Sequence, residues 1–188
     1  MRMDLTRAAL LAGALLVAAA AQGCAPSEPF VPPEDPMVGK PAPPFVFHSV
    51  HKRSFPSLNF NGKTLVLIFF RAGQPEVQLL LREMEMMHRD PAFSAVQLVA
   101  MAPERDPLTE PFWIGLRNSL DLALDYTDVA SRYGAGSLPL IVVRDFRGTV
   151  RLRLDGFVGK DFYPRLAAVR KSIKEAEAFR ARPPSSTP

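Results

Sequence analysis

Apolar residues form short continuous runs between polar segments in the central part of the chain. The runs Thr64–Phe70, Ala95–Met101 and Leu140–Val143 are rich in aliphatic, β-branched or aromatic side chains. The first run predicts a strand that is covered on both faces, the second a further buried strand, and Leu140–Val143 the first strand of a hairpin. Residues 149–154 alternate polar with apolar side chains, and the intervening Asp145-Phe-Arg-Gly148 predicts a hairpin turn. Arg151 and Arg153 alternate with leucines there, which predicts one solvated strand face.

Other segments carry apolar residues at helical spacing. Residues 75–88 place one apolar stripe on a helix, and Pro75 suits the first helical turn. That stripe consists of Val77, Leu80, Leu81, Met84 and His88. Residues 109–119 and 128–133 predict two further helices, and residues 161–178 predict a final one. Its inward face is expected to carry Phe162, Leu166, Val169, Ile173 and Ala176.

The order of these elements predicts an α/β fold. Residues 45–47 and 122–124 add two short extended pieces, and residues 51–63 are expected to form a loop. Strands that alternate with helices and close on a hairpin predict a central mixed sheet with helices on both faces. We expect a single domain at residues 45–180, preceded by a proline-rich tether at 24–44 and followed by a disordered tail at 181–188.

The N-terminus predicts export and a lipid anchor. A basic start precedes an apolar segment, Ala8–Ala21, which is shorter than the roughly 20 residues that span a bilayer. Residues 1–23 therefore fit a signal peptide. Gly23 before Cys24 resembles the bacterial lipobox, although Ala21 and Gln22 depart from its pattern. An ordinary cleaved signal with an incidental cysteine, or an uncleaved anchor, is the alternative.

Lipidation of Cys24 implies a location at the cell envelope. Two acyl chains suffice for stable anchoring, so we expect the protein to face the periplasm or the exterior. Ala25 provides no acidic retention signal, which favours the outer membrane where a cell has one. Without Arg2, Asp4 and Arg7, the full chain's 23 basic and 19 acidic residues become 21 and 18, a net charge of +3. This weak imbalance argues against nucleic acid as a partner, and a single cysteine allows no internal disulfide.

Several segments, in order, resemble the thioredoxin-like superfamily, specifically its redoxin branch (AhpC/TSA and TlpA-like proteins). The segments are Val38–Phe45, Leu58–Lys63 with the run to Phe70, Tyr133-Gly134 followed by Ser137-Leu138-Pro139, and Asp145–Gly148. The resemblance covers about Val38–Ile173 and implies a thioredoxin-like fold with thiol–disulfide or peroxidase activity. It also implies that Pro139 is the cis-proline of the family's peptide-binding loop.

The chain departs from this family at the active site. The family's Trp-Cys-x-x-Cys motif falls on Gly73, Gln74, Pro75, Glu76 and Val77, so both cysteines are missing. Thiol–disulfide exchange needs a thiolate nucleophile, and neither a Gln amide nor a Val side chain provides one. We therefore expect no thiol–disulfide or peroxidase activity, no catalytic residue and no cofactor. Glu76 is interpreted as a carboxylate that stabilises the start of a helix.

Binding can persist after the thiols are lost. Main-chain pairing to an extended peptide needs no side-chain chemistry, and the resemblance assigns that pairing to the backbone of Leu138. Gly73, Gln74, Ser137, Leu138 and Pro139 are thus a predicted peptide groove. The alternative is that Pro139 only shapes a turn.

The leading hypothesis is a lipid-anchored, redox-inactive module that binds a peptide or protein in the envelope. A redoxin that relies on a partner's thiol is the first alternative. Copper delivery is the second, because Met84, Met87 and His88 share one side of a helix and offer soft ligands. Met84 also continues the apolar stripe, which favours a place in the core.

Overall fold

A computed structural model describes residues 30–49, 54–103, 106–116, 120–125, 129–157 and 159–181. Cys24, the predicted signal peptide and residues 182–188 lie outside the described residues. Among the residues described, no helix is both long and apolar enough to cross a membrane.

Seven strands of the described chain form one mixed sheet. Their order across the sheet is β2-β1-β5-β4-β3-β6-β7. Strands β3, β4 and β5 are parallel to one another, and the remaining pairs are antiparallel. The bounds are β1 Val46–Ser49, β2 Ser54–Pro56, β3 Thr64–Phe69, β4 Val96–Pro103, β5 Asp121–Asp125, β6 Leu140–Arg144 and β7 Val150–Asp155. The predicted mixed sheet is confirmed, whereas β2 lies inside a segment expected to be loop.

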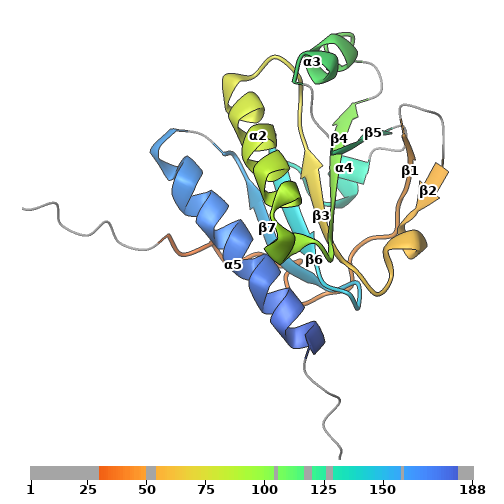
Figure 1. Cartoon of the computed structure of the whole chain (residues 1–188), viewed down its shortest axis with the longest axis vertical. Coiled ribbons are helices and arrows are strands. Elements are labelled where there is room, and N and C mark those ends of the chain that lie inside the picture. Colours follow the sequence, from red (N-terminus) through yellow and green to blue (C-terminus); the bar gives the residue numbers. More distant parts are fainter. Residues whose placement is uncertain are drawn as a thin grey trace, which may run out of the picture.

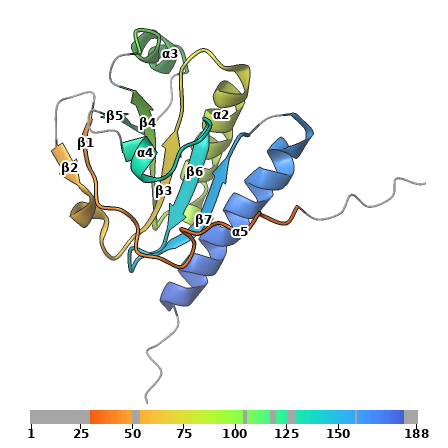
Figure 2. The same cartoon turned by 180° about the vertical axis from the view of Figure 1, so that it is seen from behind.

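Helices cover both faces of this sheet, as Figures 1 and 2 show from opposite sides. One layer contains α2 (Pro75–Arg89) and α5 (Phe162–Ala181), with α3 (Thr109–Leu116) at the end where α2 begins. The short α4 (Val129–Arg132) lies on the other face. Three 3-10 turns complete the elements of the described residues, η1 Ser57–Phe60, η2 Pro91–Phe93 and η3 Gly159–Asp161. The predicted helices are confirmed as elements, and α5 extends to Ala181.

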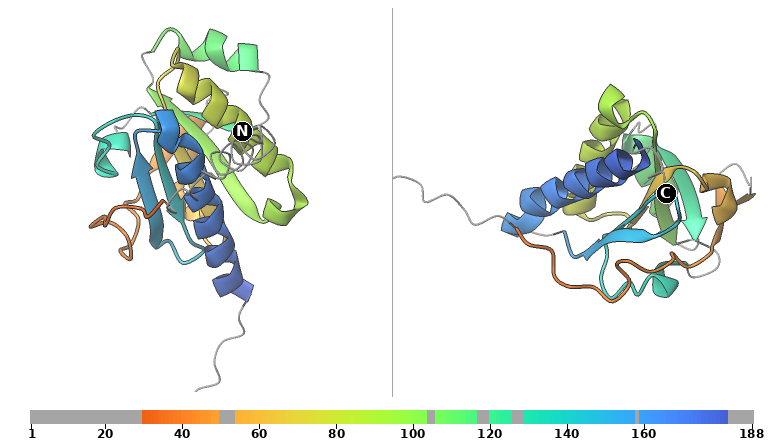
Figure 3. Two further views of the ribbon diagram at one scale, coloured as in Figure 1. Left: turned by 90° about the vertical axis from the view of Figure 1, so that its left-hand side faces the viewer. Right: turned by 90° about the horizontal axis from the view of Figure 1, so that it is seen from below.

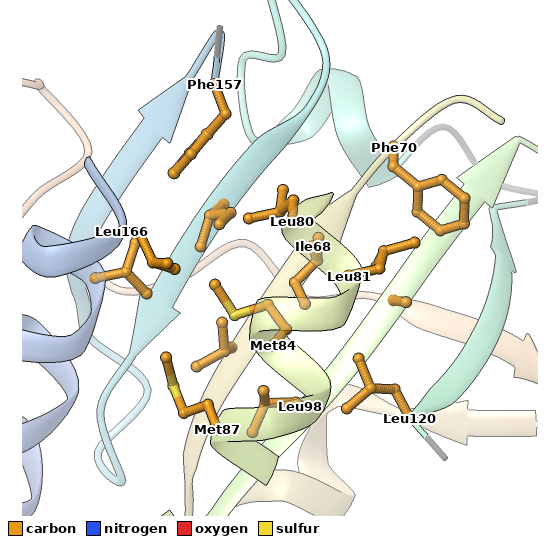
Figure 4. Packing of buried hydrophobic residues seen from close by; sticks show 14 of the residues in the cluster. Ile68, Phe70, Leu80, Leu81, Met84, Met87, Leu98, Leu120, Phe157 and Leu166 are labelled. Atoms are coloured by element: carbon orange, nitrogen blue, oxygen red, sulfur yellow. The ribbon is translucent and has the colours of Figure 1, made fainter. Parts of the chain in front are cut away.

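Alternate residues of the central strands form two cores. Val66, Ile68 and Phe70 point to the layer of α2 and α5, while Leu65, Leu67 and Phe69 point to the layer of α4. Each strand is therefore buried on both faces, as the continuous apolar runs predict. The stripe on α2 packs into the first core together with Leu98 and Leu166 (Figure 4). Met87 is buried in place of the half-buried His88.

Residues 30–44, which the sequence placed in the tether, pack along the edge strand β7. Gly39 N–H donates to Val150 O (2.8 Å), Val150 N–H to Lys40 O (2.9 Å) and Ala42 N–H to Gly148 O (2.7 Å). Pro41 also forms an isolated antiparallel β-bridge with Thr149. We call residues 30–44 the strap, because their backbone pairs with the edge strand where it begins, at Gly148 and Val150.

Arg151 and Arg153 do not share a face, contrary to the prediction. A register shift between Val143 and Arg144 interrupts the β6–β7 pairing and breaks the alternation. Arg151 lies over the Phe179 ring of α5, 5.4 Å from Cζ to the centroid, and pairs with buried Asp145 at 2.6 Å. Arg153 points to the opposite layer, where its Nε donates to Tyr133 O at 2.7 Å. It also pairs with Asp35 of the strap at 2.9 Å, with only 11% and 12% of the two side chains exposed.

Candidate functional site

The predicted site lies where the parallel strands end. Phe69, the last residue of β3, pairs with Leu140, the first residue of β6. The segment after β3 and the segment before β6 therefore meet at one edge of the sheet. Figure 2 shows the connection from α4 entering β6 at the end of the sheet where α2 begins. The structure thus brings residues 73–77 and residues 137–139 to the same end of the molecule.

Helix α2 begins with the residues to which the sequence resemblance assigns the cysteine motif. Gly73 has φ +85°, a left-handed conformation that favours glycine. Gln74 is the exposed N-cap residue, and its side chain makes no capping hydrogen bond. Its carbonyl accepts from Val77 N–H at 3.1 Å. Pro75 occupies the first turn without loss of a hydrogen bond, since N–H groups there have no helical partner.

The two positions to which the resemblance assigns cysteines differ in exposure. Gln74 is at the surface, whereas Val77 is completely buried. Residues three apart at the start of a helix lie on the same face. A pair of thiols here would have one accessible member at a helix N-terminus, where thiolates are stabilised. Gln74 and Val77 provide neither thiolate.

The opposite wall of the site is the segment before β6. The Leu138–Pro139 peptide bond is cis, as the resemblance implies. Pro139 O accepts from Gly156 N–H at 3.1 Å, which ties this segment to the end of β7. Within the described part of the chain, neither the N–H nor the C=O of half-buried Leu138 makes a hydrogen bond. Ser137 is exposed beside it. An open N–H and C=O on one residue are the groups that pair with an extended peptide.

Sequence reasoning missed two residues that shape this site. Asp106, between β4 and α3, accepts Ala72 N–H at 3.3 Å and Leu108 N–H at 3.0 Å through its two carboxylate oxygens. It therefore connects α3 to the loop that precedes α2. Leu108 lies next to Gly73, 3.7 Å from where a Cβ atom would stand, and is 57% exposed. The Asp106-Pro107 turn signal was available in the sequence, but its partner in the loop is 34 residues away.

The methionines considered as copper ligands belong to the core. Met84 is fully buried and Met87 is 2% exposed, and both pack with Leu80 and Leu98 (Figure 4). His88 is half-buried at the following position. Among the residues described, no group of three His, Cys, Asp or Glu side chains is placed to hold a metal ion. The structure thus does not bring the three proposed ligands to one exposed site.

No protein-family model matches the sequence, and no curated protein does. Solved structures, in contrast, are similar over nearly their full length. A proposed thiol:disulfide interchange protein DsbE from Chlorobium tepidum has 18% identity and a TM-score of 0.63, over 72% of this chain and 97% of that one. A thiol-disulfide oxidoreductase from Bacteroides fragilis has 17% identity and a TM-score of 0.56, over 70% and 98% of the two chains.

A third similar structure is a secreted disulfide oxidoreductase from Mycobacterium tuberculosis that is homologous to E. coli DsbE. It has 18% identity and a TM-score of 0.54, over 66% of this chain and 95% of that one. At these identities the likeness concerns the fold of the backbone alone. The resemblance read from the sequence is confirmed at this level: the chain has the thioredoxin-like fold.

Proposed function

We propose that this protein is a redox-inactive, thioredoxin-like module that binds an extended peptide segment of an envelope protein. The observation that carries the proposal is the open backbone of Leu138 at the same end of the sheet as Gln74. The groove consists of Gly73, Gln74, Ser137, Leu138 and Pro139. A bound peptide would pair with Leu138 as an added strand, and its side chains would contact Gln74 and the neighbouring Leu108.

Peptides selected from a random display library on purified residues 25–188 test this proposal. The backbone amide resonance of Leu138 should shift on titration with a selected peptide, and a peptide N-methylated at the pairing residue should bind weakly. Gln74→Trp, which fills the groove, should lower the affinity about tenfold or more. Gln78→Trp, exposed one turn further along α2, is the matched control and should bind normally. Binding that is insensitive to Gln74→Trp and leaves Leu138 unshifted would place the peptide elsewhere.

The competing enzymatic hypothesis predicts turnover. Insulin reduction and peroxide consumption by the purified domain should both stay at the background rate, because positions 74 and 77 carry no thiol. Measurable turnover that is lost in Gln74→Ala or Glu76→Ala would contradict a binding-only function. It would favour a redoxin that uses a thiol from its partner.

Membrane attachment through a lipid on Cys24 is the second part of the proposal. The lipobox-like sequence before Cys24 supports it, and we place the domain on the periplasmic or outer side of the envelope, at the outer membrane where one exists. Cys24→Ala should release the protein from the membrane fraction and abolish incorporation of labelled fatty acid. Unchanged labelling in this variant would show that the cysteine is not the acceptor.

A further inference from the structure

The strap fixes the point at which the chain reaches the domain. Phe30, its first residue, lies beneath the Arg165 guanidinium of α5, with 5.1 Å between Cζ and the ring centroid. Arg165 also donates to Asp155 O at 2.6 Å, so it connects the start of α5 to the end of β7. The Asp35–Arg153 ion pair holds the strap a few residues further on. The chain thus arrives at the edge formed by β7 and α5 (Figure 3).

This arrangement shortens the reach of the N-terminus. Six Cα–Cα steps separate Cys24 from Phe30, and a fully extended chain spans about 20 Å over that distance. The proline-rich spacer expected from the sequence would reach roughly three times as far at about 3.1 Å per residue. A lipid on Cys24 would therefore keep the β7–α5 edge within about 20 Å of the bilayer surface.

The outer face of α5 adjoins this attachment point. A shallow hollow of about 500 Å³ on that face is lined by three basic residues, one acidic residue and two alanines. They are Arg170, Lys171, Lys174, Glu175, Ala167 and Ala178. A groove of about 860 Å³ between α5 and the strap shares Ala167, Lys171 and Glu175 with the hollow. Arg170 pairs with Glu83 of α2 at 3.1 Å and Lys171 with Glu175 at 3.9 Å, so three basic side chains stand against two acidic ones on this face. The strap therefore begins beside a helix face with a slight excess of positive charge.

We propose that this outer face of α5 docks on a bilayer surface that contains acidic phospholipids. The inference rests on the proposed anchor at Cys24, and it adds an orientation to the anchored domain. Lys and Arg side chains are attracted to acidic headgroups. Tyr163 is 62% exposed at the start of α5, and tyrosine is a residue type that is enriched at the membrane–water interface. With α5 lying along the membrane, the opening of the peptide groove at the strand ends would face in a direction parallel to the bilayer surface.

Chemical tethering tests the orientation without relying on lipidation in the cell. Cys24 is the only cysteine, so the chain from residue 24 onward can be coupled specifically to a maleimide lipid in vesicles. A water-soluble N-hydroxysuccinimide ester then labels lysines, and mass spectrometry gives the rate at each position. On vesicles of phosphatidylcholine with phosphatidylglycerol, Lys171 and Lys174 should react several-fold more slowly than in solution. Lys63, exposed before β3, is the internal control and should keep its solution rate.

The other arms of the experiment separate the parts of the proposal. If Lys171, Lys174 and Lys63 all keep their solution rates on both vesicle types, the docking is overturned. If Lys171 and Lys174 are protected as strongly on pure phosphatidylcholine as on the mixed vesicles, the role of acidic lipid is overturned. Phe30→Ala combined with Asp35→Ala should release the strap and restore the solution rate at Lys171, whereas Glu34→Ala should not. Protection that survives the double variant would contradict the role of the strap. Failure of lipidation itself is detected separately by Cys24→Ala in cells.

Discussion

At the scale of single residues, Gln74 and Val77 stand at the two positions where the resemblance to thioredoxin-like proteins expects cysteines. Gln74 is exposed at the N-cap of α2 and Val77 is buried one turn later, which is the accessibility that an attacking and a resolving thiol require. The loop before them is supported by Asp106, and the cis-proline segment faces the same end of the sheet. The loss of activity that we expect therefore comes from side-chain chemistry and not from the backbone.

Restoring both thiols should restore exchange. In a Cys24→Ser background, the double variant Gln74→Cys/Val77→Cys should form a disulfide on oxidation and reduce insulin above the background rate, because the helix N-terminus stabilises the exposed thiolate. Gln74→Cys alone lacks the resolving thiol and should remain inactive in turnover. A double variant that is folded and oxidisable but does not reduce insulin would show that the backbone, too, has lost competence.

Tyr133 predicts a stability change at high pH. Its hydroxyl donates to Pro43 O of the strap at 3.0 Å, and burial raises the pKa of Tyr133 from 10.0 to about 12. The folded state then keeps this proton to higher pH than the unfolded state, so the group's contribution to the free energy of unfolding is complete below pH 10.0 and declines toward pH 12. Urea denaturation should show a steeper decline for the wild type than for Tyr133→Phe over this range. Parallel declines would contradict the raised pKa.

At the scale of elements, the residue pattern predicts most of the fold. Thr64–Phe69 and the stripe on α2 were predictable because continuous and helical apolar patterns report burial directly. Strand β2 was not predictable, because its three residues are too few to show a hydrophobic period. It is defined only by its pairing with β1. The sequence also could not predict that the Arg151 and Arg153 side chains point in opposite directions, because the register shift depends on the partner strand β6.

The candidate site was predictable only in part. Gly73–Val77 and Ser137–Pro139 could be placed by the family resemblance, and the cis bond agrees with it. Asp106 and Leu108 could not, because their contacts with the loop before α2 depend on where α3 packs. Long-range contacts of this kind leave no local pattern in a sequence.

Helix α2 provides a test of whether its methionines serve the core. Met84→Ala should lower the free energy of unfolding by about 2–5 kcal/mol, whereas the volume-conserving Met84→Leu should cost less than about 1.5 kcal/mol. Met86→Ala, at a 55% exposed position on the same helix, should change stability by no more than about 0.5 kcal/mol. Chemical denaturation measures all three. Stoichiometric uptake of Cu(I) by the wild type, abolished in Met87→Ala and His88→Ala, would instead support metal binding.

At the scale of the whole molecule, the strap extends the folded unit beyond residue 45 toward the N-terminus. The sequence placed the start of the domain at residue 45, yet residues 30–44 supply backbone partners for β7 and a carboxylate for Arg153. Arg153 is nearly buried, and removal of Asp35 would leave its charge without that partner. A buried charge that loses its partner is costly to stability. The strap is therefore both a part of the folded unit and the connection to the proposed anchor.

Three chains of different length test this view. Residues 45–181 should unfold at a lower urea concentration than residues 30–181, with a loss of about 3 kcal/mol or more from three backbone hydrogen bonds and one nearly buried ion pair. The shorter chain should also self-associate in sedimentation experiments, because the uncovered edge of β7 can pair with a second copy. An intermediate chain, residues 37–181, keeps the backbone bonds but lacks Asp35 and should be monomeric with intermediate stability. Identical midpoints for the three chains would show that the strap contributes nothing to folding, and that residues 45–181 form the complete domain.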